Sequence, residues 1–120
     1  MDQLELGSLF SGLRAEVTVA DEAGRIVFLN DRAIAHYKDH GGQELIGKSL
    51  YDCHRPSSQA KIQEFYARYR AGDLSPIRYH KDRGNGTAQS IVYIPIIVAG
   101  HFRGIAELMW VERRDLSCDI

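Results

Sequence analysis

The sequence has few of the residues that mark disulfide scaffolds, nucleic-acid binders and membrane proteins. Its 120 residues include only two cysteines, Cys53 and Cys118. These are too few for a disulfide framework and favour reduced thiols in a cytoplasmic setting. The formal net charge is −1, which argues against a nucleic-acid-binding surface with its concentrated positive charge. The longest apolar run, residues 91–100, contains Pro95 and falls well short of the roughly 20 residues of a membrane helix.

What remains is the composition of one soluble globular domain, with 44% hydrophobic and 26% charged residues. Segments with strand periodicity lie towards both ends of the chain, and helical segments lie between them. We predict strands on either side of an acidic, glycine-containing loop at 21–24, and three more strands at 75–81, 87–98 and 102–112. Two blocks of strands separated by a helical block predict an α+β fold with an antiparallel sheet.

The first predicted helix covers residues 2–13. Its apolar side chains recur at helical spacing and are Leu6, Leu9, Phe10 and Leu13. This stripe needs a cover, either the rest of the domain or a second copy of it. We therefore assign these four residues to a predicted homodimer interface.

The strongest helical pattern runs from about Ser58 to Ala71, with Gly72 after it as a stop. Ser57 or Ser58 is the expected N-cap, with Pro56 setting the start of the helix. Apolar residues follow an i, i+3, i+4, i+7 pattern at Ile62, Phe65, Tyr66 and Tyr69. Earlier in the chain, Asn30 or Asp31 is the expected cap of a shorter helix.

The region from about residue 15 to 112 resembles a PAS domain. VADEAGRIVFLN (19–30) resembles the opening hairpin of that family, ELIGKSL (44–50) its link into the next helix, and IPIIVAGHFRGIAELM (94–109) its closing hairpin. The resemblance implies a five-stranded antiparallel sheet with helices on one face and a ligand pocket between them. It also implies a sensing or relay module of a bacterial-type signal transduction or transcription regulator, not an enzyme, although a fold alone does not establish function.

The resemblance also sets the expected domain boundaries. We expect an N-terminal amphipathic helical cap over residues 1–13, a PAS-like domain over 14–113 and a C-terminal tail over 114–120. We expect the domain to form a homodimer and to bind a small molecule, with no direct contact to nucleic acid or membrane.

The segment GKSLYDCHRP, residues 47–56, places Cys53 beside His54 at the border of the implied pocket. Light-sensing PAS proteins carry a reactive cysteine in a motif like NCRFLQ. That position falls on Leu50 here, which disfavours a flavin adduct. Oxygen-sensing members bind haem iron through a histidine early in the long helix, and that position falls near Ile62. Haem binding therefore remains an alternative only if Cys53 or His54 binds the iron in a different geometry. We assign no cofactor.

Catalytic or metal-binding chemistry is the alternative interpretation. A small α+β enzyme would use Cys53 and His54, perhaps with Asp52, but adjacent residues on a helix diverge and do not form a nucleophile–base pair by adjacency alone. His36 and His40 have a chelating spacing, yet no third ligand completes a zinc site. We predict no catalytic set and no metal site, and interpret YDCH as a helix junction, capped by Asp52 or Ser57, and pocket wall.

The implied pocket should be lined from the junction, the long helix and the inner face of the sheet, with His80 as a further polar group beside Tyr79 and Tyr93. The predicted pocket residues are Phe28, Leu50, Cys53, His54, Ile62, Phe65, Tyr66, Tyr69, Tyr79, Tyr93 and Met109. A ligand-free interaction domain is a further alternative, in which aromatic side chains of this set fill the pocket. The run IVYIPIIV is apolar on both faces, which predicts that the outer face of the sheet is covered as well.

Overall fold

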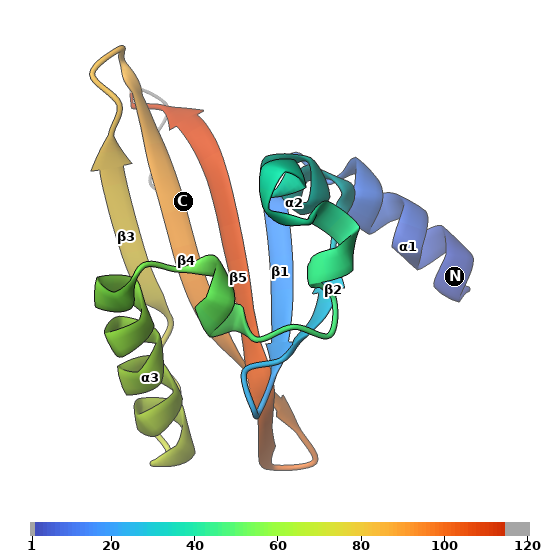
Figure 1. Cartoon of the computed structure of the whole chain (residues 1–120), viewed down its shortest axis with the longest axis vertical. Helices are drawn as coiled ribbons and strands as arrows, with labels where there is room; N and C mark the ends of the chain where they lie inside the picture. Colours follow the sequence, from blue (N-terminus) through green and yellow to red (C-terminus); the bar gives the residue numbers. More distant parts are fainter. Residues whose placement is uncertain (1, 115–120) are drawn as a thin grey trace, which may run out of the picture.

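The computed structural model describes residues 2–114, except for the side chains of residues 3, 4 and 53. A five-stranded antiparallel sheet forms the centre, in the order β2-β1-β5-β4-β3 (Figure 1). The strands are β1 (Glu16–Asp21), β2 (Ile26–Leu29), β3 (Ile77–Asp82), β4 (Thr87–Val98) and β5 (His101–Arg113). The predicted α+β fold is confirmed, and both ends of the chain contribute to one sheet because β5 pairs with β1 as well as β4.

The helices are concentrated on one face of this sheet, apart from the first, which projects beside α2 (Figure 1). They are α1 (Gln3–Gly12), α2 (Asp31–His36), the 3-10 turns η1 (Lys38–His40), η2 (Gly42–Leu45) and η3 (Leu50–Cys53), and α3 (Pro56–Arg70). Within residues 2–114, no helix is long and apolar enough to cross a membrane.

Asn30 joins α1, β1 and α2, as a buried cap with both ends of its side chain engaged. Its Oδ1 accepts hydrogen bonds from the Val17 and Ala33 N–H groups at 3.0 and 3.1 Å. Its Nδ2 donates to the carbonyls of Ala15 at 2.8 Å and Phe10 at 3.4 Å. The predicted cap is therefore confirmed at Asn30, and it also connects the first strand to the helical layer.

The start of α3 corrects one prediction. The helix begins at Pro56, and its N-cap is Arg55, which makes no side-chain capping hydrogen bond. Neither Ser57 nor Ser58 is the cap, because proline fits the first helical position, where its fixed φ is suitable and no N–H is needed. In the preceding turn the capping side chain is Ser49, whose hydroxyl accepts from the Tyr51 N–H at 3.2 Å, and not Asp52.

The register of β4 and β5 separates the two faces of the sheet. Tyr93 lies opposite Glu107 on the face covered by helices, and the neighbouring pairs therefore project from the other side. We call that other side the outer face. By register it carries Val17, Val19, Phe28, Val92, Ile94, Ile96, Ala106, Leu108 and Trp110.

Candidate functional site

A pocket of about 560 Å³ lies between the inner face of the sheet and the helices over it. The inner sides of β3, β4 and β5 form its floor, the first half of α3 forms one wall, and the end of α2 lies opposite (Figure 1). The lining residues are His36, Tyr37, His54, Arg55, Ser58, Lys61, Ile62, Phe65, Tyr79, His80, Lys81, Ile91, Tyr93, Glu107 and Met109. The size is typical of small-molecule sites, and the lining combines apolar and aromatic walls with several polar and charged groups.

An aromatic cluster forms one side of this pocket. The rings of Phe65 and Tyr93 lie 4.9 Å apart between centroids, and Tyr79 lies 6.1 Å from Phe65 and 6.3 Å from Tyr93. Such tilted and edge-on arrangements are the favoured geometries for aromatic pairs. The cluster gives the pocket an apolar surface that is held in place by α3 and by two strands.

The most buried polar group of the pocket is the carboxyl group of Glu107. Its side chain is 8% exposed, and its Oε2 atom has no hydrogen-bond partner among the described residues. Tyr93, on the adjacent strand, hydrogen-bonds the same side chain, and burial together with the Glu107 carboxylate raises the pKa of Tyr93. Since an unpaired buried acceptor is costly, Oε2 is the atom of the pocket that most needs a hydrogen-bond donor.

His54 lies against Glu107 from the end of η3. Its Nδ1 lies 2.9 Å from the Leu50 carbonyl oxygen, and its Nε2 lies 3.8 Å from Glu107 Oε2. The second distance is too long for a hydrogen bond but short enough for strong electrostatic interaction. Burial lowers the pKa of His54, but the Glu107 carboxylate and the Leu50 carbonyl outweigh that effect, and the net pKa is raised.

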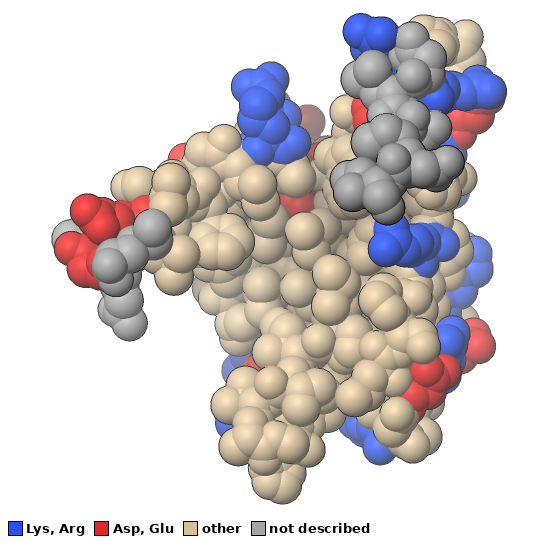
Figure 2. Space-filling view, turned by 180° about the vertical axis from the view of Figure 1, so that it is seen from behind, with Lys and Arg blue, Asp and Glu red and all other residues tan. Residues whose placement is uncertain are grey.

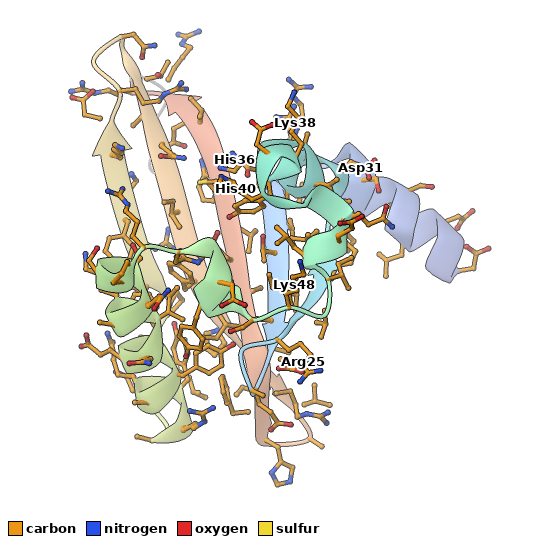
Figure 3. The ribbon with its side chains drawn as sticks, viewed as in Figure 1. Arg25, Asp31, His36, Lys38, His40 and Lys48 are labelled. Atoms are coloured by element: carbon orange, nitrogen blue, oxygen red, sulfur yellow. The ribbon has the colours of Figure 1, made fainter. Side chains whose placement is uncertain are left out.

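A second acid and histidine lie next to this pair. Glu16 Oε1 lies 3.2 Å from His36 Nδ1, at the end of α2, where Figure 3 labels the histidine. Burial raises the pKa of Glu16, and the neighbouring Glu107 raises it too, against the opposite effect of His36. Glu16 Oε1 is also buried without a hydrogen-bond partner of good geometry. Glu107 lines the pocket, and Glu16 lies beside it behind His36.

Three basic residues line the pocket where it meets solvent. Arg55, Lys61 and Lys81 are all exposed. The Lys61 ammonium group lies 5.8 Å from the centroid of the Tyr79 ring. Within residues 2–114, neither Arg55 nor Lys81 forms an ion pair. The pocket therefore has an acidic interior and a basic opening.

Several of the predicted pocket residues do lie at the pocket. The structure places these at its lining: His54, Ile62, Phe65, Tyr79, Tyr93 and Met109. His80 also borders the pocket, but its register with Ser90 puts its imidazole on the outer face, where Nδ1 lies 3.1 Å from the Ser90 hydroxyl oxygen, so it is not the polar group predicted for the pocket. The side chain of Cys53 lies outside the described part of the chain, as does the whole of Cys118.

Four predicted pocket residues lie elsewhere. Phe28 lies on the outer face, because it pairs with Val19 and its side chain projects away from the helices. Leu50 is 3% exposed and belongs to the closed core. Tyr66 and Tyr69 lie further along α3, and their hydroxyls donate to the carbonyls of Asp21 and Ser75 at 2.7 and 3.1 Å. The helix stripe therefore divides, its first half lining the pocket and its second half completing the core.

The polar groups that distinguish this pocket were not predicted. Glu107 stands between apolar residues of a strand, and Glu16 at the start of another, where acids are usually solvated. Only the register of the sheet brings them together. Parity along β5 is the one signal that could have found Glu107, since it has the same parity as the predicted Met109.

The Cys–His segment does not form a reaction centre among the described side chains. Asp52 is exposed, and the imidazole of His54 is directed to Leu50 and Glu107. His36 and His40 do not share a helix, because α2 ends between them and His40 belongs to η1 (Figure 3). No group of three or more metal-ligating side chains gathers within the described residues.

The apolar side chains of α1 remain uncovered. Leu6, Leu9, Phe10 and Leu13 are 46%, 58%, 42% and 39% exposed. The helix extends from α2 and away from the sheet, so it does not cover the outer face of its own chain (Figure 1). Seen from behind, the middle of the molecule carries mostly uncharged side chains (Figure 2).

Comparison with known proteins agrees with this architecture. The PAS fold family matches residues 10–111. No curated protein matches the chain. Among solved structures, the PAS domain of BvgS from Bordetella pertussis is 22% identical, with a TM-score of 0.64 over 96% of this chain and 90% of that one.

Two proteins from Vibrio cholerae have the same fold. A sensory box sensor histidine kinase is 16% identical, with a TM-score of 0.62 over 92% of this chain and 91% of its own. The Aer2 receptor, described as a dual PAS–haem oxygen sensor, is 18% identical, with a TM-score of 0.58 over 83% of this chain and 96% of its own. These likenesses are to sensor domains of kinases and receptors, and with the family match over residues 10–111 they show that this chain belongs to the PAS family.

Proposed function

We propose that this chain is a ligand-sensing and signal-relay module that binds a small organic molecule in its pocket and acts as a homodimer. Its setting would be a bacterial-type signal transduction or transcription regulator in the cytoplasm. The observation that carries the proposal is the pocket of about 560 Å³ with a buried Glu107 carboxylate whose Oε2 atom accepts no hydrogen bond from the described residues. The similarity to sensor domains of histidine kinases supports the same class of function.

The geometry of the aromatic residues favours a ligand over a self-filled pocket. Tyr66 and Tyr69 have hydroxyls fixed to backbone carbonyls and belong to the core. Phe65 and Tyr79 form the wall of a pocket that remains after their side chains are placed. A domain that closed its own cavity would bring such groups into the space instead.

The dimer proposal rests on two apolar surfaces, one uncovered and one covered only in part, since Val17 and Val92 on the outer face are buried. The first is the stripe on α1, and the second is the outer face, on which Ile94 is 38% exposed. Contiguous exposed apolar area of this kind marks interaction sites in proteins. A second copy is the proposed partner, because it offers both surfaces and a two-fold arrangement lets each copy cover the other.

Haem and catalysis receive less support from the site. The described candidate for a haem ligand, His54, has its Nδ1 against the Leu50 carbonyl and its Nε2 against Glu107. The carboxylate lies where an iron atom would have to approach, so the residues present do not fit haem ligation through His54. No nucleophile–base pair accompanies His54 among the described side chains, and we propose a non-enzymatic role.

The pocket proposal is tested with a variant that fills it. Ile91 lines the pocket on β4, whereas Ile94 projects from the outer face of the same strand. We expect the small-molecule fraction of a bacterial cell extract to raise the melting temperature of the wild type and of Ile94→Trp, but not of Ile91→Trp. Equal shifts in both variants, or no shift in any of the three proteins, would contradict ligand binding in this pocket.

The dimer proposal is tested by solution mass. We expect light scattering to give twice the mass of the chain for the wild type, and a monomer for Phe10→Asp and for Ile94→Asp. Leu74→Asp is the matched control, because Leu74 is also apolar and 46% exposed but lies on neither surface. A monomeric wild type would overturn the proposal. Dimers of both Phe10→Asp and Ile94→Asp would overturn it too.

A further inference from the structure

The chemistry of the ligand can be inferred from the buried acceptor atom of the pocket that receives no hydrogen bond. Glu107 Oε2 is buried and has no donor within the described residues, and the nearest histidine nitrogen is 3.8 Å away. A carboxylate oxygen accepts hydrogen bonds and donates none when it is ionised. The group that completes this site must therefore be a donor, such as an ammonium or another N–H group.

The surroundings favour a positively charged donor over a neutral one. Glu16, beside the pocket and 21% exposed, adds a second, partly buried carboxyl group with a buried Oε1 atom. Two neighbouring carboxylates attract a cation and repel an anion. The rings of Phe65, Tyr79 and Tyr93 lie together in the pocket lining, and Tyr93 hydrogen-bonds Glu107. Aromatic faces attract cations as well. An ammonium group gains from both kinds of contact.

The opening of the pocket has the opposite charge. His54 lies 3.8 Å from Glu107, and Arg55 is the next residue in the chain. Its side chain lines the pocket as well. Lys61, in the second turn of α3, also lines the pocket. An arginine without an ion-pair partner binds a carboxylate through two parallel hydrogen bonds.

We propose that the pocket binds a small zwitterion with an apolar body, whose ammonium group pairs with Glu107 and whose anionic group pairs with Arg55 and Lys61. A free amino acid with an aromatic or large aliphatic side chain is the simplest ligand of this class. The inference rests on the proposed function, in which the pocket holds a small organic molecule. It goes beyond that function in naming the charged groups of the ligand and the residues that bind them.

Three probes with the same aromatic body separate the two charges. Phenylalanine carries both charges, 2-phenylethylamine only the ammonium group and 3-phenylpropionate only the carboxylate. We expect calorimetry at neutral pH to show phenylalanine binding about 10-fold more tightly than the amine and about 100-fold more tightly than the carboxylate. These ratios follow from hydrogen bonds to charged groups.

Variants assign each charge to its residue. Glu107→Gln keeps the size of the side chain and removes its charge. It should lower the affinity for phenylalanine about 100-fold, to the level of the carboxylate, and the affinity for the amine by a similar factor. The double variant Arg55→Ala/Lys61→Ala should lower the affinity for phenylalanine to that of the wild type for the amine. Its own affinity for the amine should equal that of the wild type. Lys48→Ala is the control, because this exposed lysine, labelled in Figure 3, does not line the pocket.

Three results would overturn the inference. One is equal affinity for the amine and the carboxylate. Another is an unchanged affinity for phenylalanine in Glu107→Gln, with circular dichroism showing the variant folded. The third is no binding of any probe to the folded wild type at millimolar concentration. A cell-extract ligand that still stabilises the wild type but not Ile91→Trp would then leave the proposed sensing function intact while this ligand class is rejected.

Discussion

The imidazole of His54 and the carboxylate of Glu107 face one another in the pocket, with Nε2 3.8 Å from Oε2. The two groups come from a 3-10 turn and from the longest strand of the sheet. Their side chains are 16% and 8% exposed, so solvent screens their interaction only weakly. This contact links the helical layer to the sheet and couples the protonation of His54 to the charge of Glu107.

The protonation of His54 should therefore depend on Glu107. The histidine has a folded-state pKa above its ordinary value of 6.5, because the carboxylate and the Leu50 carbonyl outweigh desolvation. We expect a titration followed by NMR to give a pKa above 6.5 in the wild type and a lower pKa in Glu107→Gln. An unchanged His54 pKa in this variant would contradict the contact.

The same shift predicts how stability depends on pH. A histidine whose pKa is raised by folding stabilises the protein fully below the unfolded value of 6.5, and this stabilisation is lost as the pH rises through the folded value. We expect the difference in unfolding free energy between the wild type and His54→Gln to shrink from pH 6 to pH 8. A difference between the wild type and His54→Gln that stays constant from pH 6 to pH 8 would refute the prediction.

At a pH where His54 is neutral, Glu107→Gln should leave the ligand-free protein as stable as the wild type or increase its unfolding free energy by about 1 kcal/mol. The substitution removes a charge from a buried site with an unpaired oxygen, which relieves a desolvation penalty. Urea denaturation of the ligand-free protein measures the difference. A loss of more than about 1 kcal/mol would indicate that Glu107 serves the fold and not the ligand.

Asn30→Asp should be among the most destabilising of the conservative substitutions. The Nδ2 group donates to the Ala15 and Phe10 carbonyls, and a carboxylate would place an acceptor against them. We expect a loss of about 2–4 kcal/mol in chemical denaturation. Asp2→Ala, which removes the exposed cap of α1, should cost about 1 kcal/mol or less. Similar losses in both variants would contradict the role of Asn30 as a buried junction.

Gly104 and Gly7 should respond to alanine in opposite directions. A Cβ on Gly104 would overlap the Ala20 carbonyl oxygen on the paired strand β1, and its φ of 155° disfavours a side chain. Gly104→Ala should lower stability by more than about 2 kcal/mol. Gly7 lies within α1 with open space around it, so Gly7→Ala should raise stability by roughly 0.5–1 kcal/mol. Thermal unfolding of both variants measures the contrast, and losses of equal size would contradict it.

The sequence predicted the fold well because the evidence was local. Strand alternation, the Asn30 cap and the apolar spacing from Ile62 to Tyr69 are each readable within a few residues. The capping of α3 was mispredicted because serines following Pro56 look like caps, whereas proline itself occupies the first helical position.

The site was harder to predict because its polar groups meet only through the register of the sheet. Glu107 lies on β5, Glu16 on β1 and His54 in η3, and nothing in their spacing along the chain brings them together. Phe28 was placed on the wrong face because β2 is short and both neighbours of this residue are apolar. The apolar spacing from Ile62 to Tyr69 is continuous, so the sequence does not distinguish Ile62 and Phe65, which line the pocket, from Tyr66 and Tyr69, which do not.

The most direct test of the account is native mass spectrometry of the chain purified from bacterial cells without added ligand, repeated with Glu107→Gln. The account predicts a dimer of the wild type that carries a bound mass in the range of a free amino acid, and a dimer of the variant without that mass. A wild-type monomer with no bound mass would contradict both parts of the proposed function. A bound mass that Glu107→Gln retains would contradict the assignment of the buried carboxylate to the ligand.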